Sequence, residues 1–289
     1  MPILPIHEEI LPPSDDYVLK AILTHPDAKP ALMDLISAVI GRTVTDVQIR
    51  NNELPASDKD EKNERLDVNC VIDDGSQVDV EMQGSKIVSL DGGHTSFINK
   101  TVYYLTDLHS SQKSKGVRYA DFVRTYQITF SAHDVFKGAE YVTEASLRTQ
   151  DGTQITDQIN MVIIELSKLD DVLNKSVEDM TALEMWSAFL GYAADPEKRK
   201  LINDVLERKE AISMAATVLA TISKDEHERA KFMSRRKFET DMTSNILTAK
   251  SQGELDKARK IARNMKALNM PIETIAQLTE LSISEIEKL

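Results

Sequence analysis

Several residue types are scarce in this sequence, and each scarcity excludes a class of protein. The 289 residues include a single cysteine, Cys70, so no intramolecular disulfide can form. Cys70 has no second cysteine for a zinc site, and the six histidines show no pair at metal-ligand spacing. No apolar run is long enough to cross a bilayer. We therefore expect a cytoplasmic protein that is not inserted in a membrane, with Cys70 as a small buried hydrophobe.

Basic residues are also in the minority. The chain has 35 lysine and arginine residues against 47 aspartate and glutamate residues, a net charge of −12. Because non-specific affinity for nucleic acid comes from cationic groups that release counterions, this balance argues against a general nucleic-acid binder. Two basic clusters depart from the average, and each either guides a phosphate backbone or is a solvated helix face. They are Lys86, Lys100, Lys113, Lys115, Arg118 and Arg124, and Arg229, Lys231, Arg235, Arg236 and Lys237.

What the sequence does contain is a pair of alternating segments joined by a turn signal. Apolar residues occupy every second position from Leu66 to Ile72 and from Val78 to Met82, and Asp73-Asp74-Gly75 separates the two segments. A hairpin with these three residues as its loop keeps the apolar side chains on one face and places Asp67 directly across from Glu81. A two-residue loop would mix the faces, so the hydrophobic pattern favours the first register.

Carboxylates opposite each other on a sheet repel, at a cost on the order of up to 1 kcal/mol, unless something neutralises them. Mg²⁺ or Mn²⁺ is the natural candidate, since these cations prefer oxygen ligands and complete their shells with water and phosphate. The pattern thus outlines a phosphodiester-cleaving site at Asp67 and Glu81. The alternative is a hairpin with a merely polar outer face. Asp79 and Asn69 share that face; either could orient metal ligands, but we expect both to be solvated.

Several short motifs follow one another along more than half of the chain. They are Ser14-Asp15-Asp16-Tyr17-Val18-Leu19-Lys20, Arg65-Leu66-Asp67-Val68, Val80-Glu81-Met82-Gln83, Lys100-Thr101-Val102-Tyr103-Tyr104, Ser111-Gln112, Gly116-Val117-Arg118-Tyr119 and Ile164-Glu165-Leu166-Ser167-Lys168. In order and spacing this set resembles the recombination-promoting nuclease/transposase family of the PD-(D/E)XK nuclease superfamily. No single motif is specific, but the ordered set is.

The resemblance implies an α/β fold, a PD-(D/E)XK-like mixed central sheet flanked by helices, with an all-helical C-terminal extension. It also implies that Asp67 and Glu81 are catalytic ligands of Mg²⁺ or Mn²⁺, and that Gln83 acts in the site where the wider superfamily has lysine. A neutral amide can hold a water by hydrogen bonds but cannot supply a positive charge. The metal must then provide most of the activation.

Other expected site residues come from the same resemblance, except Lys86, which belongs to the basic cluster after the hairpin. Asp16 matches the N-terminal motif and would add a further acid to the catalytic set. Lys20, Lys86 and Lys100 are the expected contacts to DNA. The sequence departs from the family pattern at Leu19, where phenylalanine is usual, and at Lys100, where arginine is usual; both changes keep the chemical type.

The apolar spacing predicts three regions. Residues 1–170 are the expected nuclease domain, residues 171–245 a helical extension that oligomerises, and residues 246–289 a helical tail with a helix-turn-helix-like end. Trp186 is expected to be a packing anchor, and long helices of mixed charge favour a homodimer. In the nuclease domain we predict helices from Tyr17 to about Ile40, a helix over Thr95–Ser110, and strands near Val44–Ile49, Leu66–Ile72, Gln77–Gln83, Val123–Phe130 and Met161–Leu166.

The end of the tail predicts two short helices, the first beginning near Pro271 and the second capped by Ser282 or Ser284. Glu285 and Glu287 in the second helix suit insertion into a DNA groove poorly. We therefore expect a packing or assembly module rather than a DNA reader.

Two functions of different classes follow from these observations. The first is a metal-dependent DNA endonuclease linked to DNA recombination, transposition-like activity or defence against foreign DNA. The alternative is a catalytically weak or inactive nuclease-like protein that binds DNA or assembles through its helical C-terminal region. The presence of both Asp67 and Glu81 favours the first, while the acidic net charge and Gln83 in place of lysine favour the second.

Overall fold

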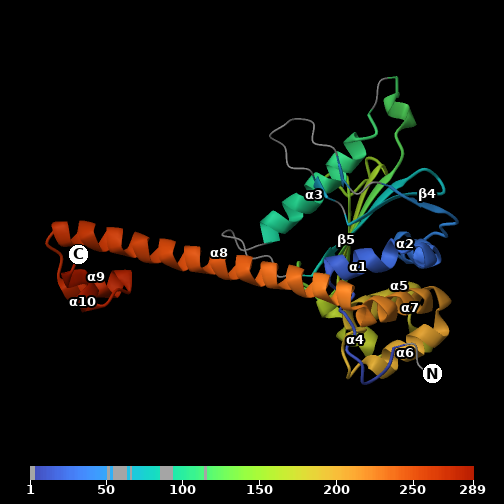
Figure 1. Cartoon of the computed structure of the whole chain (residues 1–289). Coiled ribbons are helices and arrows are strands. Elements are labelled where there is room, and N and C mark those ends of the chain that lie inside the picture. Colours follow the sequence, from blue (N-terminus) through green and yellow to red (C-terminus); the bar gives the residue numbers. More distant parts are fainter. Residues whose placement is uncertain (1–3, 51–52, 55–63, 66, 85–93, 114–115) are drawn as a thin grey trace. The chain divides into compact units, whose positions relative to one another are not determined.

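The computed structural model describes residues 4–50, 53–54, 64–65, 67–84, 94–113 and 116–289 (Figure 1). The chain forms two compact units, of which the first extends to Phe232 and the second runs from Met233 to Leu289. The long helix α8 (Glu226–Ala267) begins in the first unit and continues in the second.

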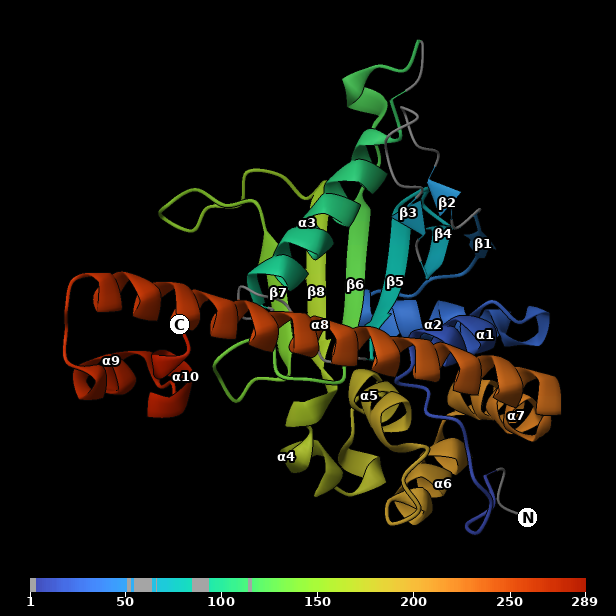
Figure 2. The same cartoon turned by 60° about the vertical axis from the view of Figure 1, so that its left-hand side comes forward.

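A mixed six-stranded sheet lies at the centre of the first unit, with strand order β1-β4-β5-β6-β8-β7 (Figure 2). The three neighbours β5, β6 and β8 are parallel, while β1, β4 and β7 are antiparallel to their partners. The strands are β1 (Val47–Ile49), β4 (Val68–Ile72), β5 (Gln77–Gln83), β6 (Thr125–Ser131), β7 (Val142–Ser146) and β8 (Ile159–Glu165). A separate pair joins β2 (Glu53–Leu54) and β3 (Glu64–Arg65). The predicted α/β fold with a mixed sheet is confirmed.

The two faces of this sheet are covered differently. On one face, apolar residues of β4, β5, β6 and β8 join a large buried cluster with residues of α1 (Asp16–Leu23), α2 (Lys29–Ile40), α5 (Ala182–Tyr192) and α7 (Glu210–Lys224). On the other face α3 (His94–Ser110) packs on β5, β6 and β8. Its Phe97 and Leu105 form a small apolar cluster with Met161 and Ile163. The polar sides of the central strands therefore lie under α3.

The helices that follow β8 complete the large core. They include α4 (Asp170–Leu173), α6 (Arg199–Arg208) and short 3₁₀ turns at Leu166–Lys168 and Val177–Asp179; others lie at Pro26–Ala28 and Tyr119–Asp121. Trp186 in α5 is fully buried, packs edge-on against Phe189, and donates a hydrogen bond from its ring nitrogen to Oδ1 of Asp34 at 2.8 Å. The prediction that Trp186 is a packing anchor is confirmed.

The N-terminal segment Leu4–Leu11 lies on the same helices. The Asn203 side chain forms hydrogen bonds with both the N–H and the C=O of Leu4, at 3.3 and 3.0 Å. The N–H of Leu11 donates to the hydroxyl of Ser223 at 3.0 Å. Residues close to the start of the chain are thus bound by α6 and α7, about 200 residues later, as the sequence separations of 199 and 212 show.

The turn of the β4–β5 hairpin has the predicted three-residue loop. Strand β4 ends at Ile72, whose N–H donates to the C=O of Ser76, and the N–H of Gly75 donates to the C=O of Ile72. Gly75 has a φ of +84°, a left-handed conformation that costs a residue with a Cβ roughly 1–2 kcal/mol. The turn residues predicted from the sequence therefore fit the backbone geometry.

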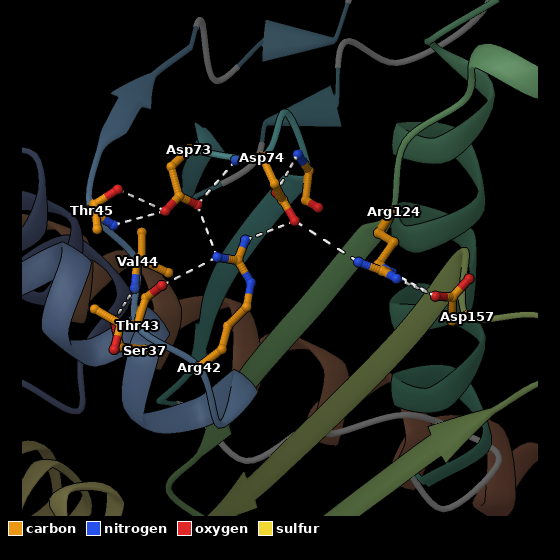
Figure 3. A network of polar contacts seen from close by, with 10 residues as sticks. Ser37, Arg42, Thr43, Val44, Thr45, Asp73, Asp74, Arg124 and Asp157 are labelled. Atoms are coloured by element: carbon orange, nitrogen blue, oxygen red, sulfur yellow. Dashed lines mark hydrogen bonds and ion pairs between the residues drawn. The ribbon is translucent and has the colours of Figure 1, made fainter.

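A network of ion pairs holds this turn in place (Figure 3). The guanidinium of Arg42 contacts Oδ1 of Asp73 at 2.9 Å and Oδ2 of Asp74 at 2.8 Å. Hydrogen bonds from Thr45, together with Arg42, lower the pKa of Asp73 to about 2. Arg124 lies 3.9 Å from Asp74. It also donates a hydrogen bond to Asp157. The acids at the turn are thus matched by cations.

Strand β7 was not predicted. The apolar pattern indicates no strand between Phe130 and Met161, but Val142–Ser146 pairs antiparallel with β8. Glu144 and Ala145 of this strand are exposed and none of its residues is fully buried. It is an edge strand without the apolar alternation that identifies the other strands.

The second unit contains the remainder of α8 and two short helices, α9 (Ile272–Thr279) and α10 (Ile283–Glu287). Ala262, Ile275, Leu281 and Ile286 form its buried cluster. Ser282, one of the two predicted caps, caps α10 through a capping box. The two-helix end of the tail is therefore confirmed. Within the part of the chain that the structure describes, each helix is either too short or too polar to span a bilayer.

Candidate active site

The β4–β5 hairpin brings two acids together in the predicted register. Asn69 pairs with Asp79 across the two strands, and continuation of this register places Asp67 beside Glu81. The N–H of Asp67 donates to Oε1 of Glu81 at 2.9 Å, and the N–H of Met82 donates to Oδ2 of Asp67 at 3.1 Å. The two carboxylates are therefore fixed next to each other by main-chain hydrogen bonds.

The environment of these acids disfavours negative charge. Burial is the main reason that the pKa of Asp67 rises to about 8, and the neighbouring charge of Glu81 raises it further. Burial likewise raises the pKa of Glu81 to about 8, followed by the charge of Asp79. Acids held in this way gain most from a bound cation, and strongly shifted pKa values of this kind are typical of functional sites.

Lys100 of α3 supplies a positive charge at the edge of the site. Its Nζ lies 3.9 Å from Oε2 of Glu81, which is an ion pair but longer than a hydrogen bond, and 5.1 Å from the ring centre of Tyr104. The side chain is 47% exposed. The ammonium group of Lys100 thus borders both Glu81 and solvent.

Asp79 and Asn69 are buried, so the prediction that they are solvated strand residues is wrong. Asp79 is 0% exposed and Asn69 is 6% exposed, because α3 and β6 cover the outer face of the hairpin. Gln127 of β6 donates from Nε2 to Oδ2 of Asp79 at 2.8 Å. Burial raises the pKa of Asp79 to about 7. A third buried acid therefore lies on the same side of β5 as Glu81.

Asp16 approaches the site from α1. Gly84 follows β5, and a Cβ at this position would lie 2.5 Å from the C=O of Ser14, so the glycine lets the N-terminus of α1 lie against the end of β5. Asp15 caps α1 by accepting from the N–H groups of Tyr17 and Val18. The charge of Asp16 contributes to the raised pKa of Asp67, which places the two acids in the same neighbourhood.

Two of the other expected site residues, Gln83 and Lys20, lie in the described part of the chain. Gln83 ends β5, is half-buried and pairs in register with Ser131 of β6. Lys20 is half-buried in the last turn of α1. Lys86, the third expected DNA contact, lies outside the described residues.

A small pocket of about 10 Å³ opens beside Glu81, between β5, β6 and α3. This is room for about one water molecule. The pocket is lined by Glu81, Met82, Gln83, Phe97, Lys100, Thr101, Tyr104, Gln127 and Thr129.

The sequence interpretation did not include Gln127 or Thr129. A signal was present, because Thr125, Gln127, Thr129 and Ser131 alternate with large side chains along β6. A polar row of this kind in the parallel neighbour of β5 continues the acidic face of the hairpin.

The donor set fits a divalent cation of the magnesium type. Asp67 and Glu81 offer carboxylate oxygens, the ligands that Mg²⁺ prefers, and Mg²⁺ typically takes only one or two protein carboxylates and keeps several waters. Among the residues that the structure describes, no three histidine, cysteine, aspartate or glutamate side chains form a complete ligand cage. Two carboxylates would leave the remaining positions around such an ion to water.

Comparison with known proteins agrees with this geometry. The model of the PD-(D/E)XK nuclease family transposases matches residues 13–249, which include α1, the acidic hairpin and α3. No curated protein and no solved structure matches the chain significantly. Because the family model spans most of the sequence and includes every expected catalytic residue, the chain belongs to the PD-(D/E)XK nuclease family transposases.

Proposed function

We propose that this protein is a cytoplasmic, metal-dependent DNA endonuclease that hydrolyses phosphodiester bonds in DNA recombination, transposition-like activity or defence against foreign DNA. The observation that carries the proposal is the fixed pair of Asp67 and Glu81, whose pKa values are both raised to about 8. Two adjacent acids with raised pKa values do not stabilise a fold by themselves, whereas a site for a divalent cation requires such a pair.

The side chains have separate roles in this proposal. Asp67 and Glu81 hold Mg²⁺ or Mn²⁺, and Asp16 adds negative charge beside them. A bound ion of this kind lowers the pKa of water and polarises a phosphoryl oxygen. Gln83 orients the attacking water through hydrogen bonds of its amide group. Attack of the water oxygen on phosphorus would form a new P–O bond and break the bond to the sugar oxygen; the attacking water loses a proton to solvent and the leaving oxygen gains one from solvent.

Lysines bind the substrate. Lys100 lies at the edge of the acidic pair with its ammonium group partly in solvent, so it can contact a DNA phosphate next to the reacting one. Lys20 on α1 serves the same purpose from the opposite side of the hairpin end, near Asp16. Local positive charge at these points allows a chain of net charge −12 to bind a polyanion.

Plasmid cleavage tests the proposal. We expect the wild type to nick or linearise supercoiled plasmid with Mg²⁺ or Mn²⁺ and not with EDTA. Asp67→Asn and Glu81→Gln should lose this activity, while Glu144→Gln, which changes an exposed acid of the same sheet, should keep it. Inactivity of the folded wild type with every metal, on linear, supercoiled and single-stranded DNA, would overturn the proposal.

A second candidate is a nuclease-like protein that binds DNA or assembles without efficient cleavage. Gln83 in place of lysine is the observation that favours it, because the site then lacks a charged group at that position. This candidate predicts metal-independent DNA retention in a gel-shift assay with no cleavage product. Cleavage that disappears in Asp67→Asn excludes it.

We further propose that the chain forms a homodimer through the helical region that follows the nuclease core. In the isolated chain α8 exposes Phe238 and Met242, one helical turn apart, with 67% and 45% of their surfaces accessible. Apolar residues spaced in this way are typical of helix pairing. Sedimentation of the wild type should give a dimer, and Phe238→Ser with Met242→Ser should give a monomer. A monomeric wild type at micromolar concentration would contradict this part of the proposal.

A further inference from the structure

Besides Oδ1 of Asp79, two buried oxygen atoms of β6 beside Glu81 have no hydrogen-bond partner in the described part of the chain. They are Oε1 of Gln127 and Oγ1 of Thr129. The two residues are 0% and 3% exposed and lie two positions apart on β6, so they face the same side of the sheet. Buried polar atoms are almost always satisfied, and an unsatisfied one is costly. Two of them at one place indicate a bound ligand.

The orientation of the Gln127 amide is fixed by its neighbour. Its Nε2 donates to Oδ2 of Asp79 at 2.8 Å, and the opposite orientation would set the amide oxygen against a carboxylate. Oε1 is therefore the atom that lacks a partner. The parallel register pairs Asp79 with Gln127 and Glu81 with Thr129, so both unpartnered oxygens belong to the strand next to the acidic pair.

Both residues line the pocket beside Glu81, together with Lys100, and its volume of about 10 Å³ admits about one water molecule. The amide oxygen is an acceptor only, and the Thr129 hydroxyl can accept as well as donate. The ligand must therefore supply hydrogen-bond donors, which excludes an anion. A water has two such donors and keeps a lone pair for a third partner.

A hydrated cation provides such a water. Mg²⁺ loses its waters reluctantly and usually keeps several when it binds carboxylates. Resting on the proposed function, we propose that the pocket holds one water of hydration of the cation bound by Asp67 and Glu81, and that this water donates to Oε1 of Gln127 and Oγ1 of Thr129. Gln127 and Thr129 are then positioning residues, which fix the cation through its water and do not touch it.

Metal binding without DNA tests this role separately from catalysis. Thr129→Val and Gln127→Met each remove one acceptor with little change of shape, and Gln127→Met also removes the hydrogen bond to Asp79. We expect the dissociation constant for Mn²⁺, measured by titration calorimetry or by the electron spin resonance of free Mn²⁺, to rise about 10- to 100-fold in each variant, the usual effect of losing an outer contact to a metal site. Thr129→Ser keeps the hydroxyl and should bind Mn²⁺ like the wild type.

Stability in EDTA separates this role from a structural one. If the two oxygens are unsatisfied without the cation, Thr129→Val should unfold at the same urea concentration as the wild type or at a higher one. Thr279→Val is the matched control, because Thr279 is buried in the second unit and its hydroxyl already donates to the C=O of Ile275. This control should lose stability and keep its affinity for Mn²⁺.

The outcomes are distinct. Wild-type affinity for Mn²⁺ in folded Thr129→Val and Gln127→Met would overturn the inference and leave the nuclease proposal intact. A wild type that binds no Mn²⁺ would overturn both. Because Gln127→Met removes the second acceptor independently, the inference can be refuted even if Thr129→Val fails to fold.

Discussion

The two ends of the β4–β5 hairpin both carry aspartates, in opposite environments. At the turn, Asp73 and Asp74 contact Arg42, and hydrogen bonds lower the pKa of Asp73 to about 2. At the other end, the half-buried Asp67 and the buried Glu81 lie side by side, and their pKa values rise to about 8. The nearest cation to Glu81 among the described ion pairs is Lys100, at 3.9 Å.

The difference separates acids that are paired with cations from acids whose ionised form the folded chain disfavours. The turn acids are satisfied within the chain and set the register of the hairpin. The acids of the other end remain unfavourable in the folded chain alone, and a fold tolerates such groups where function requires them. The turn thus positions the acidic pair, since the register that Arg42 helps to fix also places Asp67 beside Glu81.

The largest expected effect comes from replacing the acids at the site end of the hairpin. Asp67→Asn and Glu81→Gln should each lower plasmid cleavage by about 10³-fold or more, because a metal ligand contributes several kcal/mol to the transition state. Both variants should be at least as stable as the wild type in EDTA, because each removes a buried acid whose pKa is raised. Cleavage rates test the loss of activity, and urea denaturation tests the stability in EDTA. A stable variant with full activity would contradict the assignment of Asp67 and Glu81 as metal ligands.

The pH dependence of stability should have opposite signs at the two ends. Without metal, the folded site retains protons that the unfolded chain has lost, so the free energy of unfolding should fall as pH rises from about 4 through about 8. The slope is about 1.4 kcal/mol per pH unit for each retained proton. For Asp73, whose pKa is lowered, the contribution is present above about pH 4 and is lost as pH falls toward 2.

Urea denaturation in EDTA between pH 5 and pH 8 measures the site contribution. Asp67→Asn should reduce the slope, since Glu81 and Asp79 keep their raised pKa values, while Asp73→Asn should leave the slope in this range unchanged. Saturating Mn²⁺ should remove most of the slope of the wild type, since the carboxylates that bind the cation are then ionised in the folded chain as they are in the unfolded chain. A metal-free wild type whose stability does not change over this range would contradict the raised pKa values.

Gly84→Ala should separate Asp16 from the rest of the site. The added Cβ would lie 2.5 Å from the C=O of Ser14, which is main chain and cannot move aside as a flexible side chain can. We expect a loss of about 1–3 kcal/mol of stability, as in other overpacked sites, and a lower cleavage rate. Gly138→Ala, where no atom lies within 4 Å of the added Cβ, is the matched control. Equal stability of the two variants would show that α1 does not approach β5 in this way.

The smallest expected effect is at the turn. Arg42→Gln should lower the free energy of unfolding by about 0.5–1 kcal/mol, since the pair is partly exposed and ion pairs of this type contribute little. Arg118→Gln breaks a more exposed pair and should cost less. Both should keep cleavage activity. A large loss of activity with little loss of stability in Arg42→Gln would mean that the turn has a role beyond register.

The strands with strong alternation were predictable. The register of the hairpin follows from Leu66 to Met82 because a shift by one residue would turn every apolar side chain away from the core. Cys70 is buried, and burial raises the pKa of its thiol to about 12, as the predicted core position requires. The N-terminal helices, α3 and the helical tail also appear where the apolar spacing places them.

The remaining features depend on contacts between distant segments. The burial of Asp79 requires the knowledge that α3 and β6 cover the outer face of the hairpin, which local alternation does not contain. Arg124 was grouped with possible phosphate contacts, yet in the structure it contacts Asp74 and Asp157. Local patterns report which residues face the core, and they do not report which element covers the other face.

The attachment of Leu4 and Leu11 to Asn203 and Ser223 has a consequence during synthesis on the ribosome. The hairpin of Asp67 and Glu81 closes over a separation of 14 residues and can form early. The core beneath it also needs α5 and α7, which are translated more than 100 residues later. Folding therefore finishes only after α7 has left the exit tunnel. A nascent chain released before that point would carry both acids without the packed core that aligns them.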